Sequence, residues 1–143
     1  MRFGFGFEPT QHDPCNRRRN LFHHVLTGDL EVTAGSVDLS ARFGWIPLLN
    51  VALQFAEIDR RLGDEHGFAS LEFTESEDRL DFTRRDDRVR VSATYAEGSV
   101  EVPVDRLRSE LRRFSTWAAE EALRRHPCLR KHPEFATTFL DAG

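Results

Sequence analysis

Apolar and polar residues alternate along this chain at two different spacings, and each spacing predicts a type of secondary structure. A period of two, typical of strands with one buried face, occurs at 3–7, in two runs within 29–43, and in four runs within 71–102. Apolar residues recur at three- and four-residue spacing over 47–62 and over 105–125, as in amphipathic helices. The pattern therefore predicts about six to seven strands and two helices.

Proline, glycine and aspartate positions set the ends of the two predicted helices. Pro47 stands at the first helical position, and Gly63 supplies a stop for the first helix. Asp105 is a good N-cap for the second helix, and Pro127 ends it. Both segments are therefore expected to be helices with defined ends.

The order of these elements predicts the fold class. Strands and helices are segregated along the chain rather than alternating one for one, which favours α+β over a parallel α/β sheet. We expect one antiparallel sheet, built from hairpins and a meander, with the two helices packed on one face. A chain of 143 residues has the size of one domain. We therefore expect a single domain over 1–143, with an irregular loop at 9–28 and a C-terminal extension at 126–143.

Composition indicates a folded protein of the cytoplasm. Hydrophobic residues make up 39% and charged residues 31% of the chain, too much of both for disorder. No apolar run approaches the roughly 20 residues that a spanning helix needs, and the first residues lack the apolar core of a signal peptide. Cys15 and Cys128 are the two cysteines, at opposite ends of the chain. One bridge between them stays open, but we expect free thiols.

The net charge of −4 argues against general nucleic-acid binding, which draws most of its energy from neutralising phosphates. An arginine triplet at 17–19 and a basic strip at 84–90 are present, but acidic residues interleave the strip. We therefore expect no nucleic-acid partner.

Histidines and cysteines offer ligand types that zinc accepts, so we considered a metal site. The candidates are His12 and Cys15 in one loop, and His126 and Cys128 near the other end. His12 and Cys15 match half of a zinc finger, but no second pair follows at finger spacing. We therefore expect no metal and no cofactor.

Catalytic motifs are not evident in the sequence. Neither cysteine stands at the glycine-flanked start of a helix, where nucleophilic cysteines often lie. The chain has no Gly-x-Ser-x-Gly elbow, and Gly4 and Gly6 lie inside a strand pattern rather than before a helix. The carboxylates of 75–78 and 86–87 fall in predicted hairpin turns, where solvated acids are ordinary. We therefore expect that the protein is not an enzyme.

The two tryptophans differ from the other aromatic residues. Most of the twelve phenylalanines lie on the inward positions of the predicted elements. Trp45 lies just before Pro47, and Trp117 is adjacent to the apolar stripe of the second helix, so either could be exposed. Exposed tryptophan is a typical anchor of a protein interface. The alternative, a residue at the margin of the core, stays open for each.

The arrangement resembles a known class of proteins. A strand pair from Asp29-Leu30-Glu31-Val32 through Phe43 precedes a helix that opens on Pro47-Leu48-Leu49. A run of hairpins then leads through Val102-Pro103-Val104 into a long final helix. This plan resembles small actinobacterial proteins of uncharacterised families and the immunity proteins of bacterial polymorphic toxin systems. The resemblance implies an enzymatically inert cytoplasmic protein that plugs the active site of a cognate toxin by protein–protein contact.

A net-acidic inhibitor would be steered by its charge toward a basic, nucleic-acid-cleaving toxin. We therefore expect the contact surface on the solvent face of the sheet and its acidic turns, together with the two tryptophans. The expected partner-binding residues are Glu72, Glu75, Glu77, Asp78, Asp81, Trp45 and Trp117.

Two other functions stay open at this point. One is a small-ligand-binding or metal-dependent enzyme, which would show a concave apolar pocket with converging polar groups. The other is a nucleic-acid-associated regulatory protein. An inhibitor would instead show a flat or convex charged face. A homodimer is compatible with any of these functions.

Overall fold

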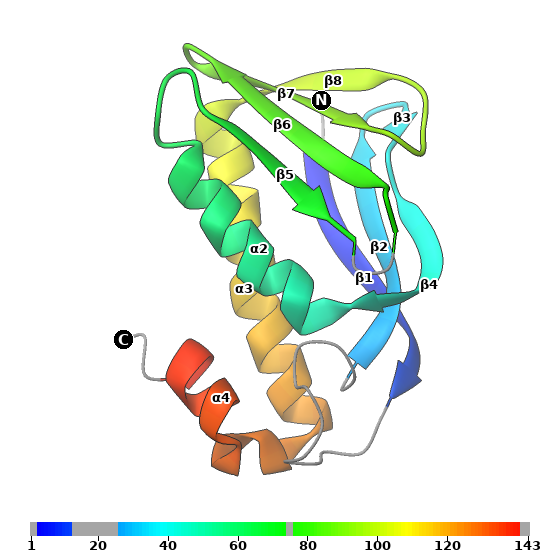
Figure 1. Cartoon of the computed structure of the whole chain (residues 1–143), viewed down its shortest axis with the longest axis vertical. Helices are drawn as coiled ribbons and strands as arrows, with labels where there is room; N and C mark the ends of the chain where they lie inside the picture. The colour runs from blue at the N-terminus through cyan, green and yellow to red at the C-terminus, as the bar shows by residue number, and fades with distance from the viewer. Residues whose placement is uncertain (1–2, 13–25, 74–75, 141–143) are drawn as a thin grey trace.

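The computed structural model describes residues 3–12, 26–73 and 76–140, and it has an α+β fold (Figure 1). The first sheet contains β1 (Phe3–His12), β2 (Leu26–Ala34), β3 (Val37–Asp38) and β4 (Ala41–Pro47). The second sheet contains β5 (Phe68–Glu72), β6 (Arg79–Arg85), β7 (Arg88–Ala93) and β8 (Ser99–Pro103). The helices are α2 (Leu48–Arg61) and α3 (Val104–Arg125), followed by η1 (Pro127–Lys131), α4 (Pro133–Phe135) and η2 (Ala136–Leu140).

Both sheets are antiparallel, but they have different topologies. In the first sheet β2 is central, with β1 on one side and both β3 and β4 on the other. The second sheet is a meander in the order β5-β6-β7-β8, which leaves β5 and β8 as its edges. The expected α+β class and the expected meander are confirmed, whereas the single expected sheet is two sheets of four strands each.

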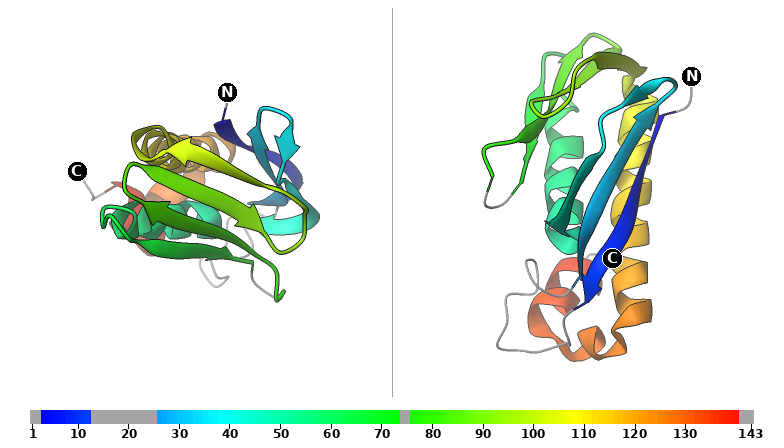
Figure 2. Two further views of the ribbon diagram at one scale, coloured as in Figure 1. Left: turned by 90° about the horizontal axis from the view of Figure 1, so that it is seen from above. Right: turned by 90° about the vertical axis from the view of Figure 1, so that its right-hand side faces the viewer.

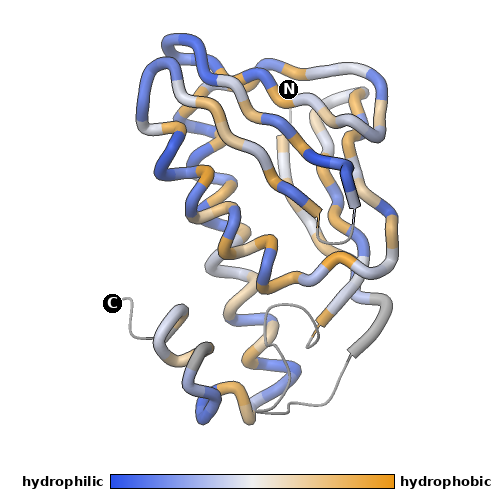
Figure 3. The backbone as a smooth tube through the Cα atoms, viewed as in Figure 1, coloured by the Kyte–Doolittle hydropathy of each residue, from blue (hydrophilic) through white to orange (hydrophobic). Residues whose placement is uncertain are grey.

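The two long helices lie side by side and contact both sheets (Figures 1 and 2). The ring of Phe55 on α2 lies 4.6 Å from that of Phe5 on β1 and 5.1 Å from that of Phe114 on α3, measured between centroids. Figure 3 shows the alternation of hydrophobic and hydrophilic residues that places one face of each element in this core. Burial of these apolar faces is the main favourable contribution to folding.

Several element boundaries differ from the expectation. β1 continues to His12 and β2 begins at Leu26, so the predicted loop over 9–28 is wrong at both of its ends, and its middle lies outside the described residues. α3 begins at Val104 after Pro103, which makes no side-chain cap, so Asp105 is in the first turn and is not the N-cap. The Asp105 carboxylate in the first turn still interacts favourably with the positive, N-terminal end of the helix dipole.

Cys128 is disulfide-bonded, which corrects the expectation of a free thiol. The chain has one other cysteine, Cys15, which lies outside the described residues. Sequence spacing could not decide this point, because it gives no distance between residues so far apart along the chain. Within the part of the chain that the structure describes, no helix combines the length and apolarity that a membrane crossing requires.

Candidate partner-binding surface

A large bulge interrupts β4 where it pairs with β2. Leu30 pairs with Ala41 and Gly28 pairs with Ile46, so two steps along β2 correspond to five along β4. Gly44 lies inside the bulge with φ of 80°, a left-handed conformation that favours glycine. Bulges re-aim side chains and are frequent next to functional sites. This one turns the residues on either side of Gly44 away from a regular strand.

The carboxylate of Asp29 holds the bulge in place. Its Oδ1 accepts a hydrogen bond from the Gly44 N–H at 2.8 Å, and the group is partly buried. A hydrogen bond to an ionised acceptor is stronger than one between neutral groups. The conformation of the bulge is therefore fixed by β2, from a residue fifteen positions earlier in the chain.

The bulge places two aromatic side chains in what we call the aromatic cluster, defined as Phe43, Trp45, Phe73 and Tyr95. The Phe43 ring stacks on Trp45, with centroids 5.4 Å apart and an interplanar angle of 21°. Edge-to-face contacts at 5.3 Å and 5.5 Å join Phe43 to Phe73 and Tyr95. Because Phe73 directly follows β5 and Tyr95 lies in the turn after β7, the cluster joins β4 to the second sheet. Trp45 forms its outer side and is 38% exposed.

Tyr95 anchors the inner side of the cluster. Its hydroxyl donates a hydrogen bond to the Leu39 carbonyl oxygen at 2.7 Å. Burial raises the pKa of the Tyr95 phenol well above its ordinary value, and the nearby carboxylates of Asp78 and Asp38 raise it further. The carboxylates of Asp78 and Asp38 therefore lie close enough to Tyr95 to interact electrostatically with its phenol.

Asp38 is an exposed acid on the first sheet. Hydrogen bonds from the Ser40 hydroxyl and backbone lower the pKa of the Asp38 carboxyl, and the hydrogen bond from Arg42 lowers it further. The Arg42 guanidinium donates to Asp38 at 3.0 Å. Asp38 therefore carries a negative charge at neutral pH, partly compensated by Arg42.

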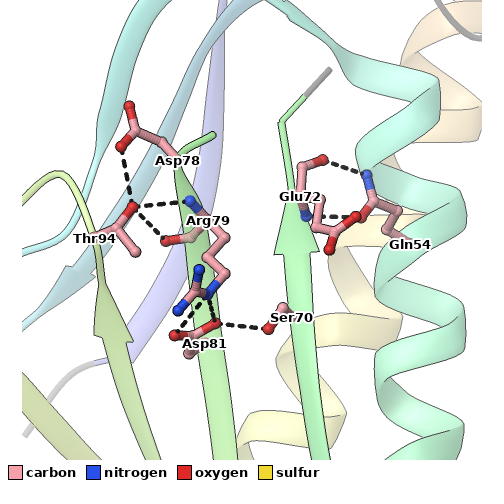
Figure 4. Close-up of polar contacts among 7 residues, drawn as sticks. All are labelled: Gln54, Ser70, Glu72, Asp78, Arg79, Asp81 and Thr94. Carbon is pink, nitrogen blue, oxygen red and sulfur yellow. Dashed lines mark hydrogen bonds and ion pairs between the residues drawn. The ribbon is translucent and has the colours of Figure 1, made fainter. Parts of the chain in front are cut away.

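Two of the expected acidic residues are held in hydrogen-bond networks on the second sheet (Figure 4). Asp78 accepts a hydrogen bond from the Thr94 hydroxyl at 3.1 Å. Asp81 accepts from the Ser70 hydroxyl at 2.6 Å and forms an ion pair with Arg79 at 3.0 Å. These carboxylates therefore form hydrogen bonds within the protein, in addition to any contact that they make with a partner.

The structure brings together only part of the expected contact set. Trp45 and Asp78 flank the same aromatic cluster, and Glu72 directly precedes Phe73 of that cluster. Glu77 is exposed in the turn before β6, while Glu75 lies outside the described residues. Trp117 is half-buried on α3, with its ring 5.6 Å from that of Phe114, and so belongs to the core margin rather than to this surface.

Sequence reasoning missed Phe43, Phe73 and Tyr95 as parts of the surface, and it missed Asp29 as the residue that holds the bulge. Glycine between two aromatic residues in a strand pattern, as at Gly44, is a signal for a bulge that could have been used.

The expected metal candidates do not form a site among residues 3–12, 26–73 and 76–140. No three histidine, cysteine, aspartate or glutamate side chains there are grouped so that they could hold a metal ion. His12 is the last residue of β1, His126 follows α3, and Cys15 lies outside the described residues. Cys128 is disulfide-bonded, so its thiolate is not a ligand in this structure.

A concave apolar groove of about 400 Å³ lies between α2, α3 and the C-terminal segment. Leu53 and Ala56 of α2, Leu123 of α3, and Phe135 and Phe139 of the C-terminal segment are among its lining residues. Leu53 is 37% exposed at this groove. This groove was not expected from the sequence.

A basic patch lies on the outer face of the second sheet. Arg85 and Arg88 are directly opposite each other on β6 and β7, and Arg90 lies on the same face. With Thr83 and Glu101 these arginines line a hollow of about 300 Å³. The outer face of this sheet is therefore mixed in charge, acidic toward the turn that bears Glu77 and basic toward the opposite end.

Comparisons of the chain with protein family models, with curated proteins and with solved structures gave no match.

Proposed function

We propose that the chain is a non-catalytic binding protein of the immunity type, which neutralises a bacterial toxin by protein–protein contact. We place the contact at the aromatic cluster and the acidic residues beside it. The observation that carries the proposal is the exposed Trp45, which is stacked on Phe43 and positioned by the bond from Gly44 to Asp29.

A rigidly held, exposed tryptophan is well suited to anchor an interface. It offers a large apolar area and loses little conformational entropy on binding, because Phe43 and the bulge already fix its position. Tryptophan is enriched among the residues whose truncation costs most binding energy. A purely structural tryptophan at this place would be expected to turn its ring into the core.

The acidic residues beside the aromatic cluster support a basic partner. Asp38 and Asp78 lie beside Tyr95, Glu77 is exposed in the adjacent turn, and the chain has a net charge of −4. An acidic rim around an apolar anchor raises the association rate with a basic surface, and this effect weakens as salt is added.

The test is a protection and pull-down assay with the toxin domain encoded next to this chain's gene. The full chain is co-expressed with that domain and scored for survival of the cells, and the affinity of the purified pair is measured. Trp45→Ala is expected to weaken binding by about 2 kcal/mol or more, roughly a thirtyfold loss of affinity. Leu53→Ala is the matched control, because Leu53 has nearly the same exposure and lines the apolar groove rather than the aromatic cluster.

The proposal fails if the toxin domain binds the Trp45→Ala and wild-type proteins equally well. It also fails if the wild-type chain gives no protection against its neighbour and does not bind it. If affinity for the toxin domain is lost only in Leu53→Ala, the contact lies at the apolar groove instead of at the aromatic cluster.

The proposal places the protein in the cytoplasm, where a toxin would be neutralised. A disulfide such as that of Cys128 is uncommon in that compartment. Cell fractionation, with alkylation of free thiols before lysis, measures the compartment and the state of Cys128 together.

A second candidate function is the binding of a small apolar ligand, and the groove of about 400 Å³ favours it. Its lining is mainly apolar, with Thr116, Glu120 and Thr138 as polar groups at its margin. This combination is typical of ligand sites. Native mass spectrometry of the protein purified from its host would show a bound ligand, and Leu53→Glu, which puts a charge into the groove, is expected to remove it.

A further inference from the structure

The backbone of β5 has a free edge that faces α2. Within the hairpin, the Phe73 N–H donates to the Asp78 carbonyl at 3.4 Å, and the Arg84 N–H donates to the Gly67 carbonyl at 2.9 Å. Groups that face the neighbouring strand alternate along an antiparallel strand. The residues whose N–H and C=O groups point away from β6 are therefore Phe68, Ser70 and Glu72.

One end of this edge is already occupied by a side chain of α2 (Figure 4). The Gln54 side-chain amide donates to the Glu72 carbonyl and accepts from the Glu72 N–H, as a neighbouring strand would. The backbone groups of Phe68 and Ser70 have no such partner among the described residues. The edge thus presents two residues with unsatisfied donors and acceptors in strand geometry.

A groove of about 290 Å³ runs along these two residues, between β5 and α2. Glu57, Ile58 and Arg61 line it from the helix, and Phe68 and Ser70 line it from the strand. Phe68 is 54% exposed, more than Trp45 or Leu53, the other large hydrophobic side chains exposed in the described part of the chain. An unsatisfied edge beside an exposed phenylalanine is a feature that proteins usually avoid.

The opposite edge of the same sheet carries a proline. The Val104 N–H donates to the Asp87 carbonyl at 2.8 Å, so Glu101 and Pro103 of β8 point away from β7. Pro103 removes the donor at its position, which is a common way to prevent strand pairing. The two edges therefore differ at one position, because β8 carries a proline at an outward-facing residue and β5 carries none.

We propose that the groove between β5 and α2 binds an extended segment of a partner protein, which adds as a fifth strand along Phe68 and Ser70. Alternating N–H and C=O groups match an extended backbone and give such binding its affinity. The far side of the groove is lined by Gln54, Glu57, Ile58 and Arg61 of α2. The groove shares Glu72 with the margin of the aromatic cluster but does not include Trp45, so this inference goes beyond the proposed function.

The charges of the groove add one feature to the expected segment. The Glu57 carboxylate is paired with Arg60 and Arg61, whereas the Glu72 carboxylate has no ion pair in the described part of the chain. The charged groups that line the groove are the carboxylates of Glu57 and Glu72 and the guanidinium of Arg61, a formal charge of −1. A basic residue in the segment, placed near Glu72, would complement this charge.

The test uses a library of random peptides displayed on phage and selected on the full-length chain. A selected peptide is expected to contain a basic residue and to protect the Phe68 and Ser70 amide protons from exchange. Methylation of the peptide nitrogens that face β5 should weaken binding at least tenfold, whereas methylation of the alternate nitrogens should leave it unchanged. This comparison needs no change in the protein.

Two matched proline variants complete the test. Ser70→Pro removes an outward N–H from β5, and Glu101→Pro removes one from β8, where proline is already accepted at position 103. Peptide affinity is expected to fall at least tenfold in the first variant and to stay unchanged in the second. Trp45→Ala should also leave it unchanged, which keeps this result independent of the proposed function.

Failure to select any peptide overturns the inference, as do peptides that bind equally well when methylated at either set of nitrogens. Protection of Phe68 and Ser70 that appears without peptide and grows with protein concentration would assign the edge to a second copy of the chain, and would also overturn it.

Discussion

Gln54 and Glu72, eighteen residues apart, are joined by two hydrogen bonds between a side-chain amide and a strand backbone. The Gln54 Nε2 donates to the Glu72 carbonyl oxygen at 2.8 Å, and the Glu72 N–H donates to Oε1 at 2.9 Å. The same Nε2 donates to Asn50 Oδ1 at 2.7 Å, which orients the amide. The pair attaches α2 to β5 and ends the groove beside it.

Replacing Gln54 with alanine should free both backbone groups of Glu72. We expect the Glu72 amide proton to exchange faster with solvent and the free energy of unfolding to fall by about 1 kcal/mol, since the bonds are exposed. Hydrogen exchange and chemical denaturation measure these effects. Gln54→Glu is the second variant, because it keeps an oxygen that accepts from the Glu72 N–H and loses the Nε2 that donates to the Glu72 carbonyl. Equal exchange rates in all three proteins would contradict the assignment.

Asp29→Ala should release the bulge that presents Trp45. The bond from the Gly44 N–H is partly buried and has an ionised acceptor, so its loss should cost about 1–2 kcal/mol of stability. With Trp117→Phe as background, Trp45 is the only tryptophan, and its fluorescence should become more accessible to a soluble quencher. Glu31→Ala, two residues along the same strand, serves as the control. Unchanged quenching in Asp29→Ala would show that Asp29 does not position the bulge.

The long periodic segments could be predicted from the sequence, because local pattern and burial agree in them. The predicted first helix and the four-stranded meander match α2 and β5 to β8 closely. The division into two sheets could not be predicted, because alternation shows which face of a strand is buried and not which strand lies beside it. β3 pairs with β2 over only two residues, and β4 pairs with β2 further along.

The candidate site was less predictable because its key contacts join residues that are distant in sequence. Phe43, Gly44 and Trp45 continue an alternating pattern, and only the bond to Asp29 shows that β4 bulges there. Trp45 and Trp117 were equivalent in the sequence, and packing against Phe114 separates them. The acids at 75–78 looked like solvated turn residues, yet Asp78 accepts a hydrogen bond from the Thr94 hydroxyl. Asp81, expected on the solvent face of a strand, accepts one from the Ser70 hydroxyl.

Tyr95 should remain protonated at a pH where ordinary tyrosines ionise. Burial and two nearby acids raise its pKa, so the folded state favours the neutral phenol. The resulting stability is fully present below the usual tyrosine pKa of about 10 and is lost as pH rises toward the raised value. Tyr95 is the only tyrosine, so tyrosinate absorbance reports on it directly.

In that titration, we expect no tyrosinate in the folded protein at about pH 11, and a midpoint near 10 in denaturant. Ionisation in alkali should therefore coincide with unfolding followed by circular dichroism. A folded protein that titrates with the ordinary midpoint would show that the phenol is accessible to solvent.

His132 should be a position at which an apolar residue stabilises the protein. The imidazole is only 4% exposed, and within residues 3–12, 26–73 and 76–140 neither ring nitrogen has a hydrogen-bond partner, although the backbone N–H of His132 donates to the Leu129 carbonyl. A buried polar group without a partner costs about 1–3 kcal/mol. His132→Leu keeps the backbone bond and removes the polar atoms, so thermal and chemical denaturation should show a gain of about 1 kcal/mol.

The matched control for this gain is His66→Leu, because His66 is exposed in the loop before β5. Its effect on the free energy of unfolding should stay within about 0.5 kcal/mol, as for most surface substitutions. If His132→Leu instead lowers stability while His66→Leu does not, the imidazole has a partner in solution. The segment from η1 to η2 would then be held by a polar contact at His132 rather than by the burial of Leu129 and Phe135 alone.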